Sequence, residues 1–191
     1  MTLNITETQE TFESFISKSF LSEETKLILA NAQIVLTPFE ELREKTPPVF
    51  PNGTEHLIRF FQERLPSNMV IDVAINTEEY QEFQFNNNYK RLGNFVVKQI
   101  AVPVFVSVFA AFVYDQFIKS DESEPQVVII DKATGSVAGH ISTLGNKEYL
   151  EPTHIKFSVS VVDSTGSKNI SYEGPATEID TVLKALKKYE Q

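Results

Sequence analysis

The chain contains no cysteine and no tryptophan, and its seven glycines are dispersed along 191 residues. The absence of cysteine excludes disulfide bonds, thiolate nucleophiles and thiolate metal sites. No G-x-G-x-x-G, Walker or nucleophile-elbow motif is present, so no nucleotide or nucleophile signature can be read directly. The first ten residues lack a basic segment followed by an apolar one, so no cleavable signal peptide is expected.

Positive charge is also scarce, because 17 Lys and Arg face 26 Asp and Glu, for a net charge of -9. Binding of nucleic acid without sequence preference needs a cationic face that displaces counterions. The sequence therefore predicts no nucleic-acid partner. An acidic surface suits a basic protein partner, and a local pocket could still hold a small anion.

One uncharged segment, Ile100–Tyr114, stands out from the rest of the chain. With its apolar flanks it extends over residues 95–118, and a helix needs about 20 residues to cross a bilayer. The pattern predicts a transmembrane helix within 95–119. The predicted span residues are Ile100, Val104, Phe105, Phe109, Phe112 and Tyr114. Ser107 and Ala111 have the spacing of small residues in close helix contacts, which predicts self-association.

The same segment has a second interpretation, as the buried core of a soluble protein. Valine occupies alternate positions over Val102–Val108, and a strand buried on both faces reads as a continuous apolar run. Residues 95–118 are too many for one ordinary strand. A strand followed by a helix would need a break, and Pro103 is the one candidate for it.

Residues 1–94 form the predicted N-terminal domain, which is α+β and rich in helices. Thr6 and Gln9 have capping-box spacing before a helix that contains Phe12 and Phe20. Ser22 is predicted to cap the next helix. A third helix is expected over 55–65, and short strands over 33–36 and 69–75.

Residues 120–191 form the predicted C-terminal domain, an antiparallel ββββα unit of two layers. Each of two hairpins turns at a segment that opens with Asp and contains Gly, Asp131–Ser136 and Asp163–Ser167, and the glycines are expected at positive φ. The last helix follows Pro175. Its apolar stripe comprises Ile179, Val182, Leu183, Leu186 and Tyr189.

Candidate sites are few. His56, His140 and His154 lie far apart and have no metal-ligand spacing, so neither a metal nor another cofactor is predicted. A small anion is the predicted ligand, because the free N–H groups at the start of the last helix attract negative charge. The predicted anion site comprises Lys168, Gly174, Ala176 and Thr177.

These observations predict a non-enzymatic membrane protein whose C-terminal domain recognises a ligand or partner in binding, sensing or signalling. The flanking Lys and Arg favour a single-pass topology with the N-terminal part in the cytoplasm. The alternative is a soluble acidic interaction module, of an inhibitor or immunity type, in which residues 100–114 are buried core. An enzyme whose catalytic groups meet only in space also fits the sequence.

Overall fold

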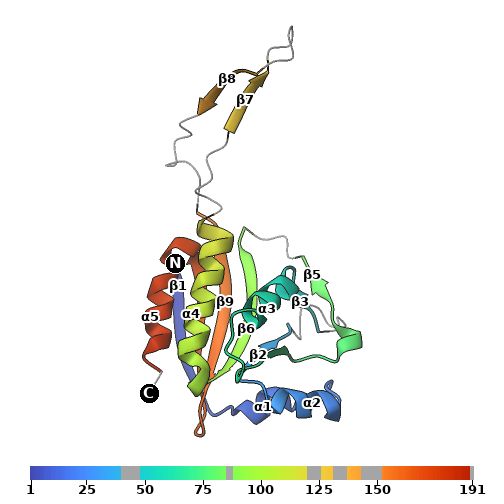
Figure 1. The fold of residues 1–191 in the computed structure, drawn as a ribbon. Helices are drawn as coiled ribbons and strands as arrows, with labels where there is room; N and C mark the ends of the chain where they lie inside the picture. Colours follow the sequence, from blue (N-terminus) through green and yellow to red (C-terminus); the bar gives the residue numbers. More distant parts are fainter. Residues whose placement is uncertain (40–47, 85–87, 120–125, 131–136, 143–151, 190–191) are drawn as a thin grey trace.

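A computed structural model of the chain describes residues 1–39, 48–84, 88–119, 126–130, 137–142 and 152–189 (Figure 1). Its centre is a six-stranded mixed sheet with the order β1-β10-β9-β6-β2-β4, which confirms the α+β class. The strands are β1 (Thr2–Thr8), β2 (Ile34–Thr37), β4 (Ile71–Val73), β6 (Lys90–Lys98), β9 (His154–Val162) and β10 (Ser167–Pro175). Two small sheets pair β3 (Phe50–Pro51) with β5 (Glu82–Phe83), and β7 (Gln126–Ile130) with β8 (Val137–Ser142).

Two β-α-β units build the part of the large sheet from β9 to β4. β2 and β4 pair in parallel, and the helix α3 (Thr54–Gln62) lies between them in the chain. β6 and β9 also pair in parallel, and the helix α4 (Val102–Val113) begins their connection. Parallel neighbours require such a crossover because the chain must return to the same end of the sheet.

α4 is the middle helix of a layer that covers one face of the sheet (Figure 1). It contacts α3 on one side and α5 (Ile179–Lys187) on the other. The rings of Phe105 and Phe109 stack at 5.3 Å, and both meet Phe95 of the sheet edge-on. Phe109 also meets Phe157 of β9 at 4.7 Å. α4 is apolar on most of its circumference because the sheet and two helices surround it.

The described residues cover the opposite face of the sheet only in part. The short helices α1 (Phe12–Ile16) and α2 (Glu23–Ala30) pack over one end of it, in a second apolar cluster that includes Val35, Val96 and Val162. Elsewhere the face carries small polar side chains, and the Ser158 hydroxyl donates to the Asn94 side-chain oxygen at 2.8 Å.

The apolar segment is divided between a strand and a helix. β6 ends at Lys98, a turn of 3₁₀ helix spans Gln99–Ala101, and α4 begins at Val102. The residues from Phe95 to Lys98 are therefore strand, and the predicted single helix is shorter than 95–119. The strand expected from the alternating valines is wrong, because Val102–Val108 is helical. Pro103 lies in the first turn of α4, where its missing N–H costs no helical hydrogen bond.

The C-terminal predictions are partly confirmed. β9 and β10 form the predicted antiparallel hairpin, and α5 buries most of its predicted apolar stripe. β7 and β8 pair as predicted, but as a separate two-stranded sheet, so the four strands do not form one unit. The turn Asp131–Ser136 lies outside the described residues.

The glycine of the β9–β10 turn has a different role from the one predicted. Among the described residues, positive φ occurs at Gly53 and Gly93, and not at Gly166. A Cβ atom at Gly166 would lie 2.5 Å from the Thr8 carbonyl oxygen of β1. Glycine is required here because the two chain segments approach closely.

The N-terminal capping box is wrong, because Thr6 lies in β1, which pairs with β10 along its whole length. The predicted cap at Ser22 is confirmed, since its hydroxyl oxygen accepts from the Thr25 N–H at 3.1 Å.

Candidate functional site

The residues of the predicted anion site do not come together. Lys168 lies near the start of β10 and Gly174 near its end. They are six positions apart along an extended strand, a distance of about 20 Å. The Lys168 ammonium lies 3.4 Å from the Glu7 carboxylate and 4.7 Å from the centre of the Tyr189 ring.

The start of the last helix uses its polar groups internally. The Ala176 N–H donates to the Thr153 carbonyl at 2.8 Å, whereas Thr177 is exposed. The Tyr172 hydroxyl donates to the Pro175 carbonyl at 2.7 Å, and burial, with the nearby charge of Glu178, raises the pKa of Tyr172 to about 12. A Cβ atom at Gly174 would lie 2.8 Å from that hydroxyl oxygen, so glycine lets the Tyr172 hydroxyl approach the backbone here.

The predicted span residues lie on different sides of the helical segment. Phe105, Phe109 and Phe112 point into the core, with at most 4% of their surface exposed. Val104 is half-buried. The remaining two predicted span residues face outward, with Ile100 77% and Tyr114 52% exposed. Ser107 and Ala111 are exposed as well.

By length and composition, the helical segment Gln99–Ile118 could cross a membrane, and 44% of its most apolar 18-residue stretch is buried inside the protein. The core helix of a soluble protein meets the same criteria, so this helix alone does not identify a span.

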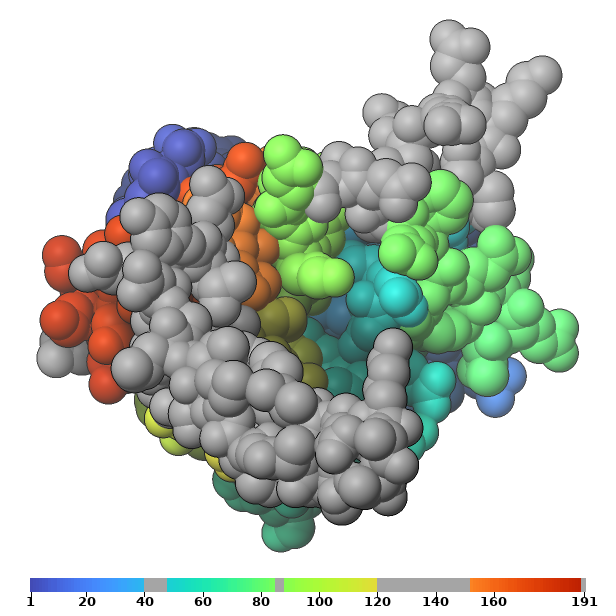
Figure 2. Space-filling model, turned by 90° about the horizontal axis from the view of Figure 1, so that it is seen from above, coloured from blue at the N-terminus to red at the C-terminus, as the bar shows by residue number. Residues whose placement is uncertain are grey.

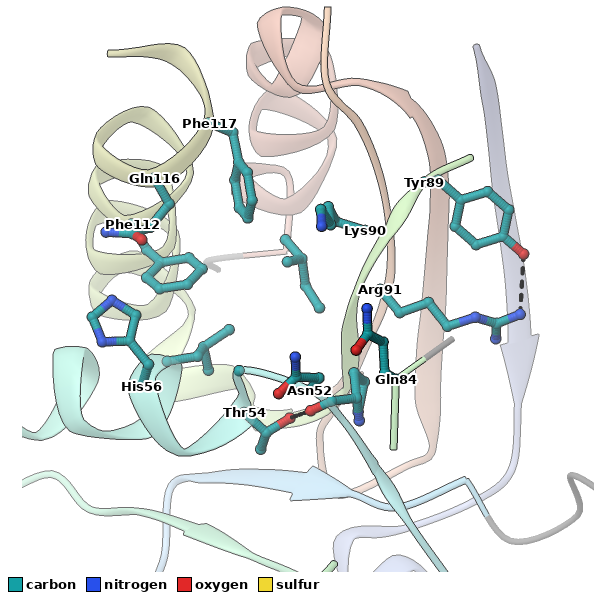
Figure 3. Close-up of a pocket in the computed structure, with 14 residues that line it drawn as sticks. Asn52, Thr54, His56, Gln84, Tyr89, Lys90, Arg91, Phe112, Gln116 and Phe117 are labelled. Carbon is teal, nitrogen blue, oxygen red and sulfur yellow. Dashed lines mark hydrogen bonds between the residues drawn. The ribbon is translucent and has the colours of Figure 1, made fainter. Parts of the chain in front are cut away.

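A cavity of about 260 Å³ opens at the end of the molecule where α4 finishes (Figure 3). Four parts of the chain contribute to its walls: the loop before α3 with the first turn of that helix, the residue after β5, the segment at the start of β6, and the end of α4 with the turn that follows it. In Figure 2, seen from above, the cyan segment before α3 lies beside the light-green start of β6. The lining residues are Pro51, Asn52, Gly53, Thr54, His56, Leu57, Gln84, Tyr89, Lys90, Arg91, Leu92, Phe112, Gln116 and Phe117.

The sheet and the helices both contribute apolar side chains to the cavity. Leu57 and Leu92 are buried, as is Phe112, and Phe117 is half-buried. Phe112 and Phe117 meet edge-on at 6.1 Å. The His56 ring lies 6.0 Å from the Phe112 ring, and Figure 3 shows these two residues with Gln116 on one side of the cavity.

The charged part of the cavity is cationic. Lys90 and Arg91 contribute the formal charges, and among the described residues that line the cavity none is Asp or Glu. The Arg91 guanidinium donates to the Tyr89 hydroxyl at 3.0 Å, on the side opposite His56 (Figure 3). The chain as a whole has a net charge of -9, so the charge of Lys90 and Arg91 is opposite in sign to that of the chain.

The helix that frames the cavity begins at an unusual cap. Gly53 precedes α3 with φ +92°, a conformation that glycine adopts without strain. It has no side chain to accept from the first N–H groups of the helix. The Glu82 carboxylate does so instead, accepting from the Gly53 N–H at 2.8 Å and from the Glu55 N–H at 2.7 Å.

Burial and the hydrogen bonds of this cap shift the pKa values of Glu82 and Tyr80. Burial alone would raise the pKa of Glu82, but hydrogen bonds from Glu55, Tyr80 and Gly53 lower it overall. The Tyr80 hydroxyl donates to Glu82 at 2.7 Å, and burial together with that carboxylate raises the pKa of Tyr80. Glu82 therefore occupies the positive end of α3, next to the cavity, and fixes the loop that carries Asn52 and Thr54.

A π-helical turn, Tyr114–Ile118, follows α4 and supplies Gln116 and Phe117 to the cavity. π turns are rare, and they recur at functional sites because the wider turn reorients side chains. Sequence periodicity gives no signal for such a turn.

Of the three histidines, His56 lines the cavity and His154 begins β9, and the side chain of His140 lies outside the described residues. Within the described part of the chain, no group of His, Asp and Glu residues is placed to hold a metal ion. Comparison with protein-family models, curated proteins and solved structures finds no match, so a functional proposal depends on the geometry of the cavity.

Proposed function

We propose that this chain is a non-enzymatic binding protein that holds a small organic anion in the cavity between α3, β6 and the end of α4. The lining of that cavity carries the proposal, because its described residues combine Lys90 and Arg91 with an apolar wall and include no carboxylate. Small-molecule sites have this composition, an apolar surface with a few polar groups that orient the ligand.

The size of the cavity limits the ligand. A volume of about 260 Å³ lies just below the usual range for drug-sized ligands, about 300–1,000 Å³. A metabolite with one anionic group and one aromatic or branched aliphatic group fits these limits. Its anionic group would lie toward Lys90, and its apolar group against Phe112 and Phe117.

Binding of benzoate, compared with benzylamine, tests the proposal. The two probes share a ring and differ in the sign of their charge. We expect benzoate to shift the ¹H–¹⁵N signals of Gln116 and of the backbone around Lys90, and benzylamine to leave them unchanged. Equal shifts from both probes would show that the cavity does not select anions.

Three variants locate the effect. Lys90→Gln removes one cation and is expected to weaken benzoate binding about tenfold, the size of one charge-assisted hydrogen bond. Gln116→Glu adds a negative charge to the wall and should weaken it further. Lys184→Gln, at an exposed position of α5, is the matched control and should bind as the unsubstituted protein does. A loss at Lys184→Gln equal to that at Lys90→Gln would contradict a local site.

The second candidate is a membrane-anchored binding protein, and the uncharged outer side of the helix favours it. Ile100 and Tyr114 are exposed there, with Ser107 and Ala111 between them. Under this proposal, residues 99–118 would leave the core, enter the bilayer and associate with a second copy. Recovery of the protein in the pellet after an alkaline carbonate wash would support it. Quantitative recovery in the supernatant would support the soluble interaction protein.

A further inference from the structure

β1 forms one edge of the large sheet. It pairs with β10 on one side, over seven consecutive residue pairs without a bulge. Its other side has no neighbouring strand among the residues that the structure describes. An edge of this kind presents a row of backbone N–H and C=O groups that a further strand can use.

Sheet edges in soluble proteins are usually protected against such pairing by lysine, proline, a bulge or a very short strand. β1 has none of these. Its sequence is T-L-N-I-T-E-T, uncharged from Thr2 to Thr6, and Ile5 is 47% exposed.

The two faces of β1 differ in polarity. Leu3 and Ile5 lie opposite Tyr172 and Ile170 of β10, whose side chains belong to the main core beneath the helices. Side chains alternate along a strand, so Asn4 and its neighbours at positions 2 and 6 point to the polar face.

We propose that β1 pairs with β1 of a second copy of this chain, antiparallel, about a twofold axis through Asn4. In this register Leu3 of each copy lies opposite Ile5 of the other, and Thr2 lies opposite Thr6. Apolar residues meet on the helix side and polar residues meet on the other side. A register centred on Ile5 would instead place Leu3 opposite Glu7.

This pairing is isologous, since the same strand serves both copies, and such twofold dimers are the commonest soluble oligomers. The two sheets would become one continuous sheet, and the β1 edge of each copy would be covered by the other. The proposal is independent of the anion cavity, which lies between α3, β6 and α4.

Cysteine cross-linking tests the register, because the chain has no cysteine of its own. In the proposed dimer the two copies of Asn4 face each other with Cα atoms about 5 Å apart, within the range that a disulfide bridges. Asn4→Cys should therefore form a covalent dimer under oxidised glutathione. Thr2→Cys is the control, because its two copies lie about 13 Å apart along the strands.

A mixture gives the sharper result. Thr2→Cys and Thr6→Cys should each cross-link poorly alone and efficiently together, since Thr2 faces Thr6 across the axis. Cross-linking of Thr2→Cys alone that equals Asn4→Cys would overturn the register. Circular dichroism of the reduced variants checks that each one folds.

Light scattering on a sizing column tests the dimer itself. We expect a mass of twice the 21.6 kDa chain at about 100 µM, and a monomer for Ile5→Lys, which places a charge at the edge. Leu27→Lys, at a 71% exposed apolar position of α2, should remain dimeric. A monomeric unsubstituted protein, or an equal loss of dimer in Leu27→Lys, would overturn the proposal.

Discussion

Substitutions at two nearby positions of α4 distinguish the hypothesis of a core helix from that of a membrane span. Phe109 is fully buried and its ring contacts the rings of Phe95, Phe105 and Phe157. Ala111, two residues further on, is exposed. We therefore expect Phe109→Ala to destabilise the protein strongly and Ala111→Lys to have little effect.

The magnitudes follow from the packing. Removing a buried phenylalanine ring costs about 3–5 kcal/mol, because the transfer free energy is lost and a cavity is left behind. Typical domains have free energies of unfolding of about 5–15 kcal/mol, so this loss is a large fraction of the total. A surface substitution changes stability by about 0.5 kcal/mol or less. In a bilayer, by contrast, lysine near the middle of a helix costs about 2.5–3.5 kcal/mol.

Urea unfolding without detergent, followed by far-ultraviolet circular dichroism, measures both effects. With a slope of about 2 kcal/mol per molar urea, Phe109→Ala should lower the midpoint by roughly 1.5–2.5 M. Ala111→Lys should lower it by less than about 0.3 M on the same slope. Phe109→Leu, which keeps more of the buried volume, should fall between them.

Two results would refute this reasoning. One is an Ala111→Lys protein as destabilised as Phe109→Ala, since an exposed position cannot lose that much. The other is an unsubstituted protein that stays in the membrane pellet and unfolds only in detergent, which would favour the span.

Three further predictions concern contacts away from α4. Glu82→Gln should lower the free energy of unfolding by about 1–2 kcal/mol at pH 7, because the carboxylate caps α3. Because the pKa of Glu82 is lowered in the folded protein, the carboxylate contributes stability at pH values above its ordinary pKa of 4.5, and this stability is lost as the pH falls through the folded-state pKa. The variant and the parent should therefore have similar free energies of unfolding in acid. Urea titrations at pH 7 and pH 3 measure this, and a difference independent of pH would contradict the cap. Gly166→Ala should cost about 1–3 kcal/mol in urea unfolding, because its methyl group would meet the Thr8 carbonyl, and an unchanged midpoint would refute the close approach. Lys168→Gln breaks an exposed ion pair with Glu7 and should cost less than about 1 kcal/mol at low salt, with a smaller effect at 0.5 M NaCl; a loss that salt does not reduce would mean that packing, not charge, is responsible.

The parts of the fold that the sequence predicts are those with strong local periodicity. β9 alternates cleanly, and α5 repeats its apolar residues at helical spacing, so a strand before the turn at Asp163 and a helix after Pro175 were both expected. The segment T-L-N-I-T-E-T shows only a weak alternation, and it forms β1 because β10 offers an edge. Tertiary pairing decides its conformation.

The parallel pairing of β6 with β9 could not be read from the sequence, since about 60 residues separate the strands and no local signal records a parallel neighbour. The apolarity of α4 was visible, but its cause was not. A helix covered by a sheet and two flanking helices has the same composition as a span.

The candidate cavity was missed for a related reason. Its walls come from segments between residues 51 and 117, and none of them carries a motif. The predicted anion site used neighbours in sequence, Lys168 and Gly174, which a strand holds apart. The spacing of Glu82 from α3 gave no signal of a helix cap, because the carboxylate reaches the helix through the fold.

The position of β1 also has a consequence for how the chain is made. Thr2 pairs with Glu173, so β1 can pair only after about 170 further residues have been synthesised. At about 5–20 residues per second this interval is on the order of ten seconds or more. Contacts of such long range slow folding, because a large loop must close before they form. The edge that completes the sheet is therefore expected to form late, after β6 and β9 have joined beneath α4.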